Sequence, residues 1–489
     1  MTDFVPVFDF SAHESVEERQ ARGRAARKRV ARRDQAAWMV AADRREPVTL
    51  LADQETTRLP ALLPLRYERM GASVFAFYRG SAVVMASDLG AQPNSGLRVQ
   101  LCGDAHLSNF GLFAAPDRTP VFDLNDFDET NPGPFEWDVK RLAVSFLLAA
   151  KDNDLSPESG LCAARTAARQ YRLSIAANAQ RTEIDNWYER IGTVQLEDFA
   201  RQAEGAAGVK RVAKVQKRAQ ARSMWTAVEK LTELVDGHRR FLNAPPLLVR
   251  VPPDGTSDEA LSTAVQTYRE SLADDRRALL ERYDVIDVGH KVVGVGSVGL
   301  QAWVLLLEGR DANDVLVLQA KQAQQSVLEP YTAPSENPNS CQRVVVGQRL
   351  NQAASDSYIG RSEGVLKRRQ FYLRQLRDMK WSPDPSSMSA AQLDRYAGLC
   401  GHVLARAHAR SGDAIAISSY LGSTDTFDEA IASFSQAYAK TVAADYLDFT
   451  AGVVSGRFGT GDGGAALETY LASIRSGGTG TLNTDGTIH

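Results

Sequence analysis

The segment from residue 101 to residue 130 places a few polar residues at fixed distances along the chain. Asp104 stands five residues before Asn109, and Asp126-Phe127-Asp128 follows the run Val121-Phe122-Asp123-Leu124. A short apolar run of this kind predicts a buried strand, which would hold the acidic residues at its end rigidly. A chain with this segment must therefore fold so that two polar loops meet beside one strand.

The residue types in these loops suit phosphoryl transfer. Moving a γ-phosphoryl group requires a carboxylate near the acceptor hydroxyl and oxygen ligands for the magnesium ion that neutralises the triphosphate. Mg²⁺ prefers carboxylate and amide oxygens, supplemented by phosphates and water. The segment therefore predicts Asp104 as the catalytic base, Asn109 and Asp126 as Mg²⁺ ligands, and ATP as the donor. The other interpretation is that these residues only cap turns, as Asp and Asn commonly do.

The run Gly103-Asp104-Ala105-His106-Leu107-Ser108-Asn109 resembles the Gly-Asp-x-His-x-x-Asn loop of the protein-kinase-like superfamily, especially its aminoglycoside- and choline-kinase-like branch. The resemblance implies that Asp104 is the catalytic base and that Asn109 binds metal. It also makes Asp126-Phe127-Asp128 the counterpart of the Asp-Phe-Gly motif, with Asp128 in place of the glycine.

Further residues near this loop are assigned supporting roles. The run from Gly133 to Ala143 looks like the segment that follows the motif in this branch, which implies that Asp138 braces the catalytic loop. His106 is expected to brace the same loop by hydrogen bonding. Asp123 and Asp128 are accessory candidates for the site.

Four other runs resemble a narrower group, the bacterial domain-of-unknown-function family 2252. They are Phe75-Ala76-Phe77-Tyr78-Arg79-Gly80, Gly347-Gln348-Arg349, Arg374-Gln375-Leu376-Arg377-Asp378-Met379-Lys380 and Ala407-His408-Ala409-Arg410-Ser411-Gly412-Asp413. His408 and Asp413 in the last run are expected to be structural, because no asparagine follows Asp413 at the metal-ligand spacing. The resemblance covers most of the chain and implies no substrate.

A second informative stretch, residues 285 to 321, contains the glycines Gly294, Gly296 and Gly299. This glycine spacing is the basis of an alternative, an NAD-dependent oxidoreductase, in which a helix would begin at the glycines. The apolar run 302–307 predicts a β-hairpin instead. Glycines at a hairpin tip let backbone amides approach phosphate oxygens, so the three are predicted to cover the phosphates of ATP. A third strand then ends on Lys321, where a kinase places the lysine that contacts the α- and β-phosphates.

The helix after that strand should offer a glutamate to Lys321. The helix-like run 341–354 contains none, so the partner is expected to be Glu329 or to be missing. The hairpin follows the catalytic loop by about 190 residues, whereas ordinary kinases place it first, which indicates a circular permutation that surface termini permit. The alternative is an insertion, with residues 65–100 forming a partial nucleotide lobe and Arg79, at the end of a strand-like run, contacting phosphate. Arg79 is a candidate site residue in either arrangement.

Composition places few limits on this hypothesis. The 489 residues are 44% hydrophobic and 24% charged, which predicts two or three lobes with a sizeable core. The four cysteines, Cys102, Cys162, Cys341 and Cys400, lie far apart, which argues against structural zinc or disulfides and favours a reducing cytoplasm. No apolar segment has the length of a signal core or a membrane span.

Two runs are strongly basic although the formal net charge is only −3: RQARGRAARKRVARR (19–33) and KRVAKVQKRAQAR (210–222). Both predict helices. They lack aromatic interleaving and a base-reading motif, so a solvated basic face is favoured over an acidic partner or nucleic acid. The first run is also an autoinhibitory candidate if it packs over the acidic catalytic face.

These signals predict an α+β, kinase-like, two-lobed fold that is circularly permuted. The expected organisation is a basic helical leader (1–60), a helical lobe with the catalytic loop and metal site (61–242), a proline-rich linker (243–258), a β-rich nucleotide lobe (259–380), a helical segment completing the C-lobe (381–473) and a disordered tail (474–489). The favoured function is ATP- and Mg²⁺-dependent phosphate transfer to a hydroxyl of an unidentified small molecule or protein. The alternatives are an inactive kinase-like scaffold that binds nucleotide or a partner, and transfer of AMP onto a protein.

Overall fold

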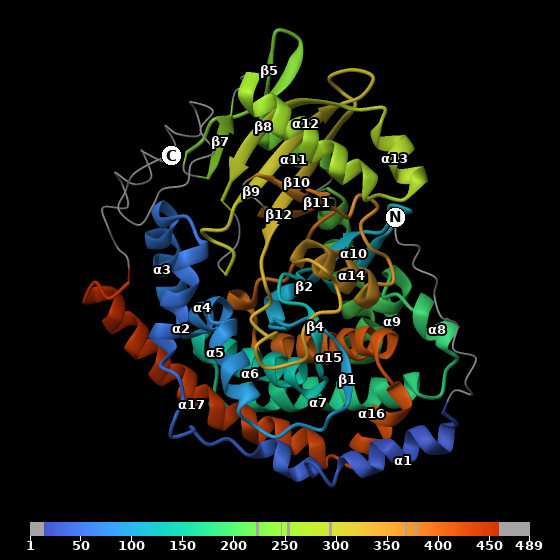
Figure 1. Cartoon of the computed structure of the whole chain (residues 1–489). Coiled ribbons are helices and arrows are strands. Elements are labelled where there is room, and N and C mark those ends of the chain that lie inside the picture. Colours follow the sequence, from blue (N-terminus) through green and yellow to red (C-terminus); the bar gives the residue numbers. More distant parts are fainter. Residues whose placement is uncertain are drawn as a thin grey trace.

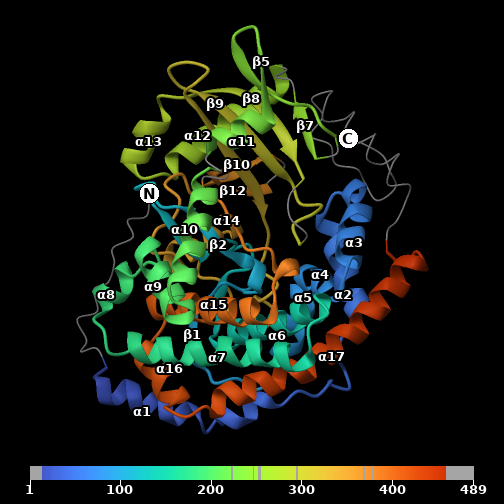
Figure 2. The ribbon, with the colours of Figure 1, turned by 180° about the vertical axis from the view of Figure 1, so that it is seen from behind.

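The structure is a computed structural model that describes residues 14–221, 224–245, 247–251, 255–292, 296–366, 369–376 and 379–458. It is a mixed α+β protein. A six-stranded sheet lies at one end of the molecule, and a group of long helices lies at the other (Figures 1 and 2). The two short hairpin-like sheets that carry the acidic loops lie between them.

Helices make up most of the described chain. The α-helices are α1 (Val16–Ala26), α2 (Pro47–Asp53), α3 (Leu63–Gly71), α4 (Val74–Gly80), α5 (Ala82–Gly90), α6 (Glu136–Asp152), α7 (Pro157–Asn178), α8 (Glu183–Tyr188), α9 (Thr193–Glu204), α10 (Ala206–Gln220), α11 (Met224–Leu231), α12 (Gly255–Glu270), α13 (Asp274–Leu280), α14 (Ser340–Asn351), α15 (Ala390–Ser411), α16 (Ala414–Leu421) and α17 (Thr426–Val454). Short 3₁₀ helices are η1 (Arg32–Ala36), η2 (Gln54–Thr57), η3 (Pro60–Leu62), η4 (Leu107–Asn109) and η5 (Pro385–Ser387).

The strands form one large sheet and three two-stranded sheets. They are β1 (Arg98–Leu101), β2 (Phe110–Ala114), β3 (Pro120–Leu124), β4 (Asn131–Pro134), β5 (Thr232–Val235), β6 (His238–Phe241), β7 (Leu248–Val251), β8 (Asp284–Lys291), β9 (Ala302–Glu308), β10 (Val315–Ala323), β11 (Gly360–Leu366) and β12 (Arg369–Gln375). The large sheet is antiparallel in the order β11-β12-β10-β9-β8-β7, and the pairs are β1-β4, β2-β3 and β5-β6.

The predicted hairpin and third strand are confirmed as β8, β9 and β10, and the helix-like run that follows them is α14. A strand, and not a helix, follows the glycine-rich run, so the helix that an NAD-dependent oxidoreductase requires is missing there. Side chains alternate across β10: Leu316 and Leu318 pack on the face covered by α12, whereas Val317 joins the cluster under α11. Lys321 lies on the same face of β10 as Val317 and near the end of the strand. Its side chain therefore reaches Asp128 at the helical end.

The helical end is built around α6, α7, α15 and α17, which pack on one another. Helix α6 is buried along almost its whole length because it lies between the acidic loops and the other helices. Helix α15 approaches α7 very closely at Gly401, where a Cβ atom would lie 2.3 Å from the carbonyl oxygen of Ala167. Only glycine permits that approach, which brings the polar end of α15 beside β1.

The basic helix α1 lies at the end of the molecule farthest from the sheet (Figure 1), where it packs on α16. Arg27 Nε donates to the carbonyl oxygen of Tyr420 (2.9 Å) and Arg32 Nη1 to that of Leu421 (2.7 Å). Arg19 Nε donates to the carboxylate of Asp413 at 3.0 Å. The prediction that this run covers the catalytic face is therefore wrong, because its arginines contact both ends of α16. The second basic run forms α10, whose Lys and Arg side chains are exposed.

Other expectations need correction at the level of secondary structure. Residues 63–90 form the helices α3 to α5, so they are not a partial nucleotide lobe of strands, and Arg79 ends a helix. Leu248–Val251, assigned to the proline-rich linker, is the edge strand β7. Val228 and Phe241 pack under the large sheet although they precede that linker. The expected tail, 474–489, lies outside the described residues. Among the helices of the described ranges, none combines the length and the apolar character of a membrane span.

The buried pair of Arg406 and Asp123 joins α15 to β3 and provides a test of this packing. Arg406 is fully buried and donates to the Asp123 carboxylate and, at 3.0 Å, to the carbonyl oxygen of Asn351. Arg406→Met would leave a buried carboxylate without its cation, so we expect a loss of about 3–5 kcal/mol in the free energy of unfolding. Denaturant titration measures it. The matched control is Arg201→Met, which removes an exposed pair with Asp198 and should change stability by less than about 1 kcal/mol; equal losses in both variants would contradict this account.

Candidate active site

The catalytic-loop candidate Asp104 is held by a buried arginine of α6. Arg141 donates from Nε (2.8 Å) and from Nη2 (2.7 Å) to Asp104 Oδ1. Burial raises the pKa of the Asp104 carboxyl, and Arg141 partly offsets that effect. The second carboxylate oxygen lies on the side of His106, whose Nε2 is 3.7 Å away. One oxygen of Asp104 is thus fixed, while the other faces the site.

The loop around Asp104 is stabilised by its own backbone and by α6. Asn109 Nδ2 donates to the carbonyl oxygen of Asp104 (2.7 Å), which fixes this side chain and assigns its oxygen to any cation. The backbone N–H of Asn125 donates to the carbonyl oxygen of Asn109 (3.0 Å). The loop that contains Asp104 and the end of β3 are therefore in direct contact, as expected from the sequence.

Asp138 braces the loop as expected. It accepts hydrogen bonds from the backbone N–H groups of Cys102 (2.7 Å) and Gly103 (3.1 Å). His408 Nε2 lies 3.3 Å from Asp138 Oδ2, and its Nδ1 lies 2.9 Å from the hydroxyl of Tyr171. His408 is fully buried, so it supports the loop from behind and does not face the site.

His106 also supports the loop. Its Nδ1 accepts a hydrogen bond from the backbone N–H of Ser108 at 3.2 Å. Burial lowers the pKa of this imidazole well below its usual range, and the nearby guanidinium groups of Arg79 and Arg141 lower it further. His106 is therefore neutral at physiological pH, and it carries its proton on Nε2, on the side of Asp104.

Lys321 at the end of β10 meets the acidic segment that follows β3. Its Nζ donates to Asp128 Oδ2 (2.6 Å) and lies 3.7 Å from Asp126 Oδ1. Asp128 also accepts from the hydroxyl of Tyr372 (2.5 Å) and from that of Ser297 (3.3 Å). Burial opposes both charges, yet the carboxylates hold the pKa of Lys321 above its ordinary value and Lys321 holds the pKa of Asp128 below its own. The junction is therefore an ion pair.

Glu329 does not pair with Lys321 in this structure. Its carboxylate lies 3.4 Å from Nε of Arg343 on α14, and it accepts from the backbone N–H of Ser326 (3.2 Å). Arg343 donates to the carbonyl oxygens of Asp128 (2.9 Å) and Thr130. Helix α14 lacks a glutamate but carries Arg343. This arginine links the acidic segment to the residue after β10, because it also donates to the carbonyl oxygen of Gln324 (2.7 Å).

The glycine-rich turn lies beside this junction, but only part of it is described. Gly294 is outside the described residues, whereas Gly296 and Gly299 belong to a turn in which Gly299 has a φ of +93°, a conformation that favours glycine. Arg58 Nη1 donates to the carbonyl oxygens of Gly296 (2.8 Å) and Val298 (2.6 Å). The turn is thus held by the segment that precedes α3.

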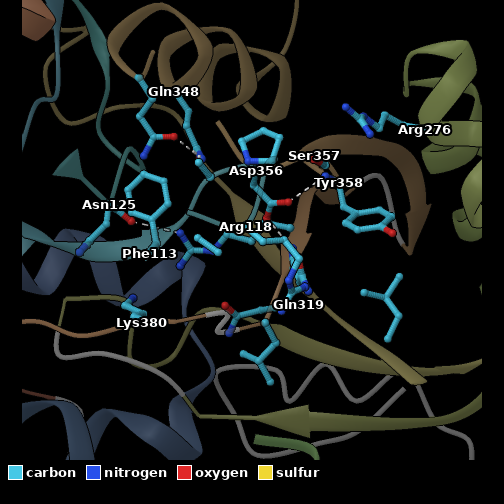
Figure 3. Close-up of a pocket in the computed structure, with 18 of the residues that line it drawn as sticks. Phe113, Arg118, Asn125, Arg276, Gln319, Gln348, Asp356, Ser357, Tyr358 and Lys380 are labelled. Atoms are coloured by element: carbon cyan, nitrogen blue, oxygen red, sulfur yellow. Dashed lines mark hydrogen bonds between the residues drawn. The ribbon is translucent and has the colours of Figure 1, made fainter. Parts of the chain in front are cut away.

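Two cavities meet at the junction. The first, which we call the sheet cavity, has a volume of about 560 Å³. Figure 3 shows it among side chains of β10, α14 and the loops near Asn125 and Asp356. Lys321 lines it, as do Leu112 and Leu376. The second, the loop cavity, has a volume of about 660 Å³ and is lined by Asp104, His106 and Asn109.

Asp126 and Ser297 line both cavities, so they mark the passage between them. The Asp126 side chain is 34% exposed and is therefore accessible to a ligand. Within the described ranges, no three His, Cys, Asp or Glu side chains are grouped so that they could hold a metal ion by themselves. A divalent cation would therefore rest on Asp126 and Asn109 together with phosphate and water oxygens, which is a donor set that Mg²⁺ accepts.

The two remaining candidates, Arg79 and Asp123, lie in different surroundings. Arg79 lines the loop cavity near Asp104 and Asp126, both of which favour its charge. Asp123 is 4% exposed and is engaged by Arg406. This accessory candidate therefore stabilises the contact of β3 with α15, and it lines neither of the two cavities.

Sequence reasoning missed several residues of the site. Arg141 lies three residues after Asp138, and that i, i+3 spacing places both on the α6 face that meets the loop, so the sequence contained a signal for it. Tyr372 pairs with Lys321 across β10 and β12, which no local pattern could show. Ser297 lies within the glycine-rich run and Arg343 on α14, and neither a serine among glycines nor an arginine on a helix is a local signal for these contacts.

Glu129 provides a test of the electrostatics beside the junction. Burial raises the pKa of Glu129 to about 7 from its ordinary value of 4.5, although the Val327 N–H donates to it at 2.8 Å. The folded state therefore holds this proton more tightly than the unfolded state, so its contribution to stability decreases as the pH rises from 4.5 to about 7. We expect Glu129→Gln to gain stability relative to the wild type across that pH range, measured by denaturant titration at each pH. A difference that does not change with pH would contradict the burial of this carboxyl.

Comparisons with known proteins support the family resemblance. No curated protein and no solved structure matches the chain. The family model for DUF2252, described as an uncharacterized protein conserved in bacteria, matches residues 58–452. This match covers most of the chain and includes the acidic loops, the large sheet and α15. The chain therefore belongs to the bacterial DUF2252 family.

Proposed function

We propose that this protein is a kinase-like phosphotransferase that uses ATP and Mg²⁺ to phosphorylate a hydroxyl group. The observation that carries the proposal is the 2.6 Å contact of Lys321 with Asp128, beside Asp126, between segments almost 200 residues apart. It joins the lysine at the end of a third strand to the acidic segment after β3, which contacts the loop that contains Asp104 and Asn109. Four residues selected from sequence for one reaction thus lie around two adjoining cavities.

Each residue has a role that follows from its position. Asp104 would accept the proton of the acceptor hydroxyl, because one of its oxygens is held by Arg141 and the other faces the loop cavity. Asp126 and Asn109 would hold Mg²⁺, which neutralises the charge of the triphosphate when it is bound. Lys321 would bind phosphate oxygens from the sheet cavity, and Gln319 and Leu376 would line the space for the base.

Asp128 supplies the carboxylate that α14 lacks. In the kinase arrangement a glutamate on the helix after the third strand holds the lysine. Here Asp128 contacts that lysine and also accepts from Tyr372 on β12 and Ser297 of the glycine-rich turn. The ammonium group of Lys321 is thus oriented without a glutamate on the helix. The presence of Asp128 in place of the glycine is therefore compatible with a working site.

The path of the chain is consistent with a circular permutation. The N–H of Gln100 in β1, just before the catalytic loop, donates to Ser411 Oγ at the end of α15 (3.2 Å). In an unpermuted order, a helix placed like α15 would lead directly into that strand. In this chain α15 continues into α16, and β1 is reached instead from α5. The same site would therefore be assembled with different chain ends.

A second candidate, an inactive kinase-like scaffold that binds a partner without turnover, is favoured by the ion pair itself. Asp128 lies where phosphate oxygens would contact Lys321. If Asp128 does not share the lysine with a phosphate, the nucleotide would be excluded from the junction. Nucleotide binding is therefore the property to test first.

Thermal unfolding tests this proposal. A ligand at about 100 times its dissociation constant adds about 2.7 kcal/mol of stability, which is a shift of a few degrees for a chain of this size. We expect ATP with Mg²⁺ to give such a shift, and ATP with a chelator or NAD alone to give little. Lys321→Met should lose most of the shift because it removes the amine that contacts phosphate.

The matched control for that variant is Lys217→Met, since Lys217 lies on the exposed face of α10 and should leave the shift unchanged. A shift in Lys321→Met equal to that of the wild type would contradict the role of Lys321. No shift with Mg-ATP in the wild type would contradict the nucleotide site as a whole.

A further inference from the structure

We infer that the acceptor of this site is an oxyanion-bearing compound, a phosphate ester or a carboxylate, whose anionic group binds Arg79 in the loop cavity. The inference rests on the proposed function, because it assigns the loop cavity to the acceptor. It goes beyond that function by naming the class of compound that the cavity recognises.

Arg79 is a cation without a hydrogen-bonded partner among the described residues. Its guanidinium donates no hydrogen bond there, and its Nε atom is buried and unsatisfied. It lies near the ring of Phe75, 5.9 Å from the centroid, which gives only a weak attraction. Burying a charged group without a hydrogen-bonded partner is costly. An anionic ligand would recover that cost.

The other charges of the loop cavity already have partners. Arg45 pairs with Asp53 (2.7 Å), and Arg58 donates from Nη1 to the carbonyl oxygens of Gly296 and Val298, although its Nε has no hydrogen-bond partner among the described residues. Asp104 is engaged by Arg141 through a single oxygen. Among the described arginines that line this cavity, Arg79 is therefore the one whose whole guanidinium group is left for a ligand.

The position of Arg79 separates it from the nucleotide. Lys321 lines the sheet cavity, whereas Arg79 and Asp104 line the loop cavity, and Asp126 lies between them. A compound with its anionic group at Arg79 would place a hydroxyl near Asp104 only if the two groups belong to one small molecule. The geometry thus favours a compact hydroxylated anion over a neutral polyol.

Calorimetric titration of the full chain tests the inference without nucleotide. One arm uses inorganic phosphate and the other glycolate, so the arms distinguish a phosphate ester from a carboxylate. We expect at least one probe to bind the wild type about tenfold or more tightly than Arg79→Gln, because the variant loses charge-assisted hydrogen bonds to the anion. Arg79→Lys should fall between them, since it keeps the charge and loses the planar fork.

The control variant is Arg310→Gln, on the exposed turn between β9 and β10, which should bind both probes as the wild type does. Equal affinities in the wild type and Arg79→Gln, including no measurable binding by either, would overturn the inference. Binding that is lost in Lys321→Met but kept in Arg79→Gln would overturn it as well, because the anion would then occupy the nucleotide site.

The unfolding temperature distinguishes a ligand-binding role of Arg79 from a purely structural one. Removing an unpartnered buried cation should leave the unfolding temperature of Arg79→Gln equal to or above that of the wild type, whereas a structural arginine would lower it. Because no arm contains ATP, failure of the nucleotide site in the thermal experiment and failure of the anion site here are distinguishable.

Discussion

The contact of Lys321 with Asp128 is the interaction on which the proposed site depends. It connects the large sheet to the loops of the helical end, and both groups remain charged because each stabilises the other in a largely buried position. Tyr372 and Ser297 add hydrogen bonds from two further elements of the sheet end. Arg343 then fixes the backbone of the same segment, so one acidic residue is held from four directions.

The supports of Asp104 follow the same logic. A carboxylate that must act as a base has to be accessible through one oxygen and fixed through the other. Arg141 and Asp138, one helical turn apart on α6, hold the Asp104 side chain and the preceding backbone, and His408 holds Asp138 from behind. The burial of α6 therefore serves the site, since a mobile helix could not hold two loops in register.

Local patterns predicted the elements of this site well. The spacing of Asp104 and Asn109, the hairpin before Lys321 and the helix without a glutamate could all be read from neighbouring residues, because strand and helix periodicity is a local property. The partner of Lys321 could not, since it comes from a segment 193 residues away. The aromatic run before Arg79 was interpreted as a strand although it is a helix, because its large side chains are buried against α17 and α6 by tertiary packing.

The fate of labelled phosphate tests the central claim most directly. The protein would be incubated with Mg²⁺, a small-molecule extract of bacterial cells, and ATP labelled on either the γ- or the α-phosphate. The account predicts that the γ-label moves to a product as ADP forms, and that Asp104→Asn slows this transfer by about 10²- to 10⁴-fold. Transfer of the α-label, unchanged ATP with the wild-type protein, or full activity of Asp104→Asn would contradict it.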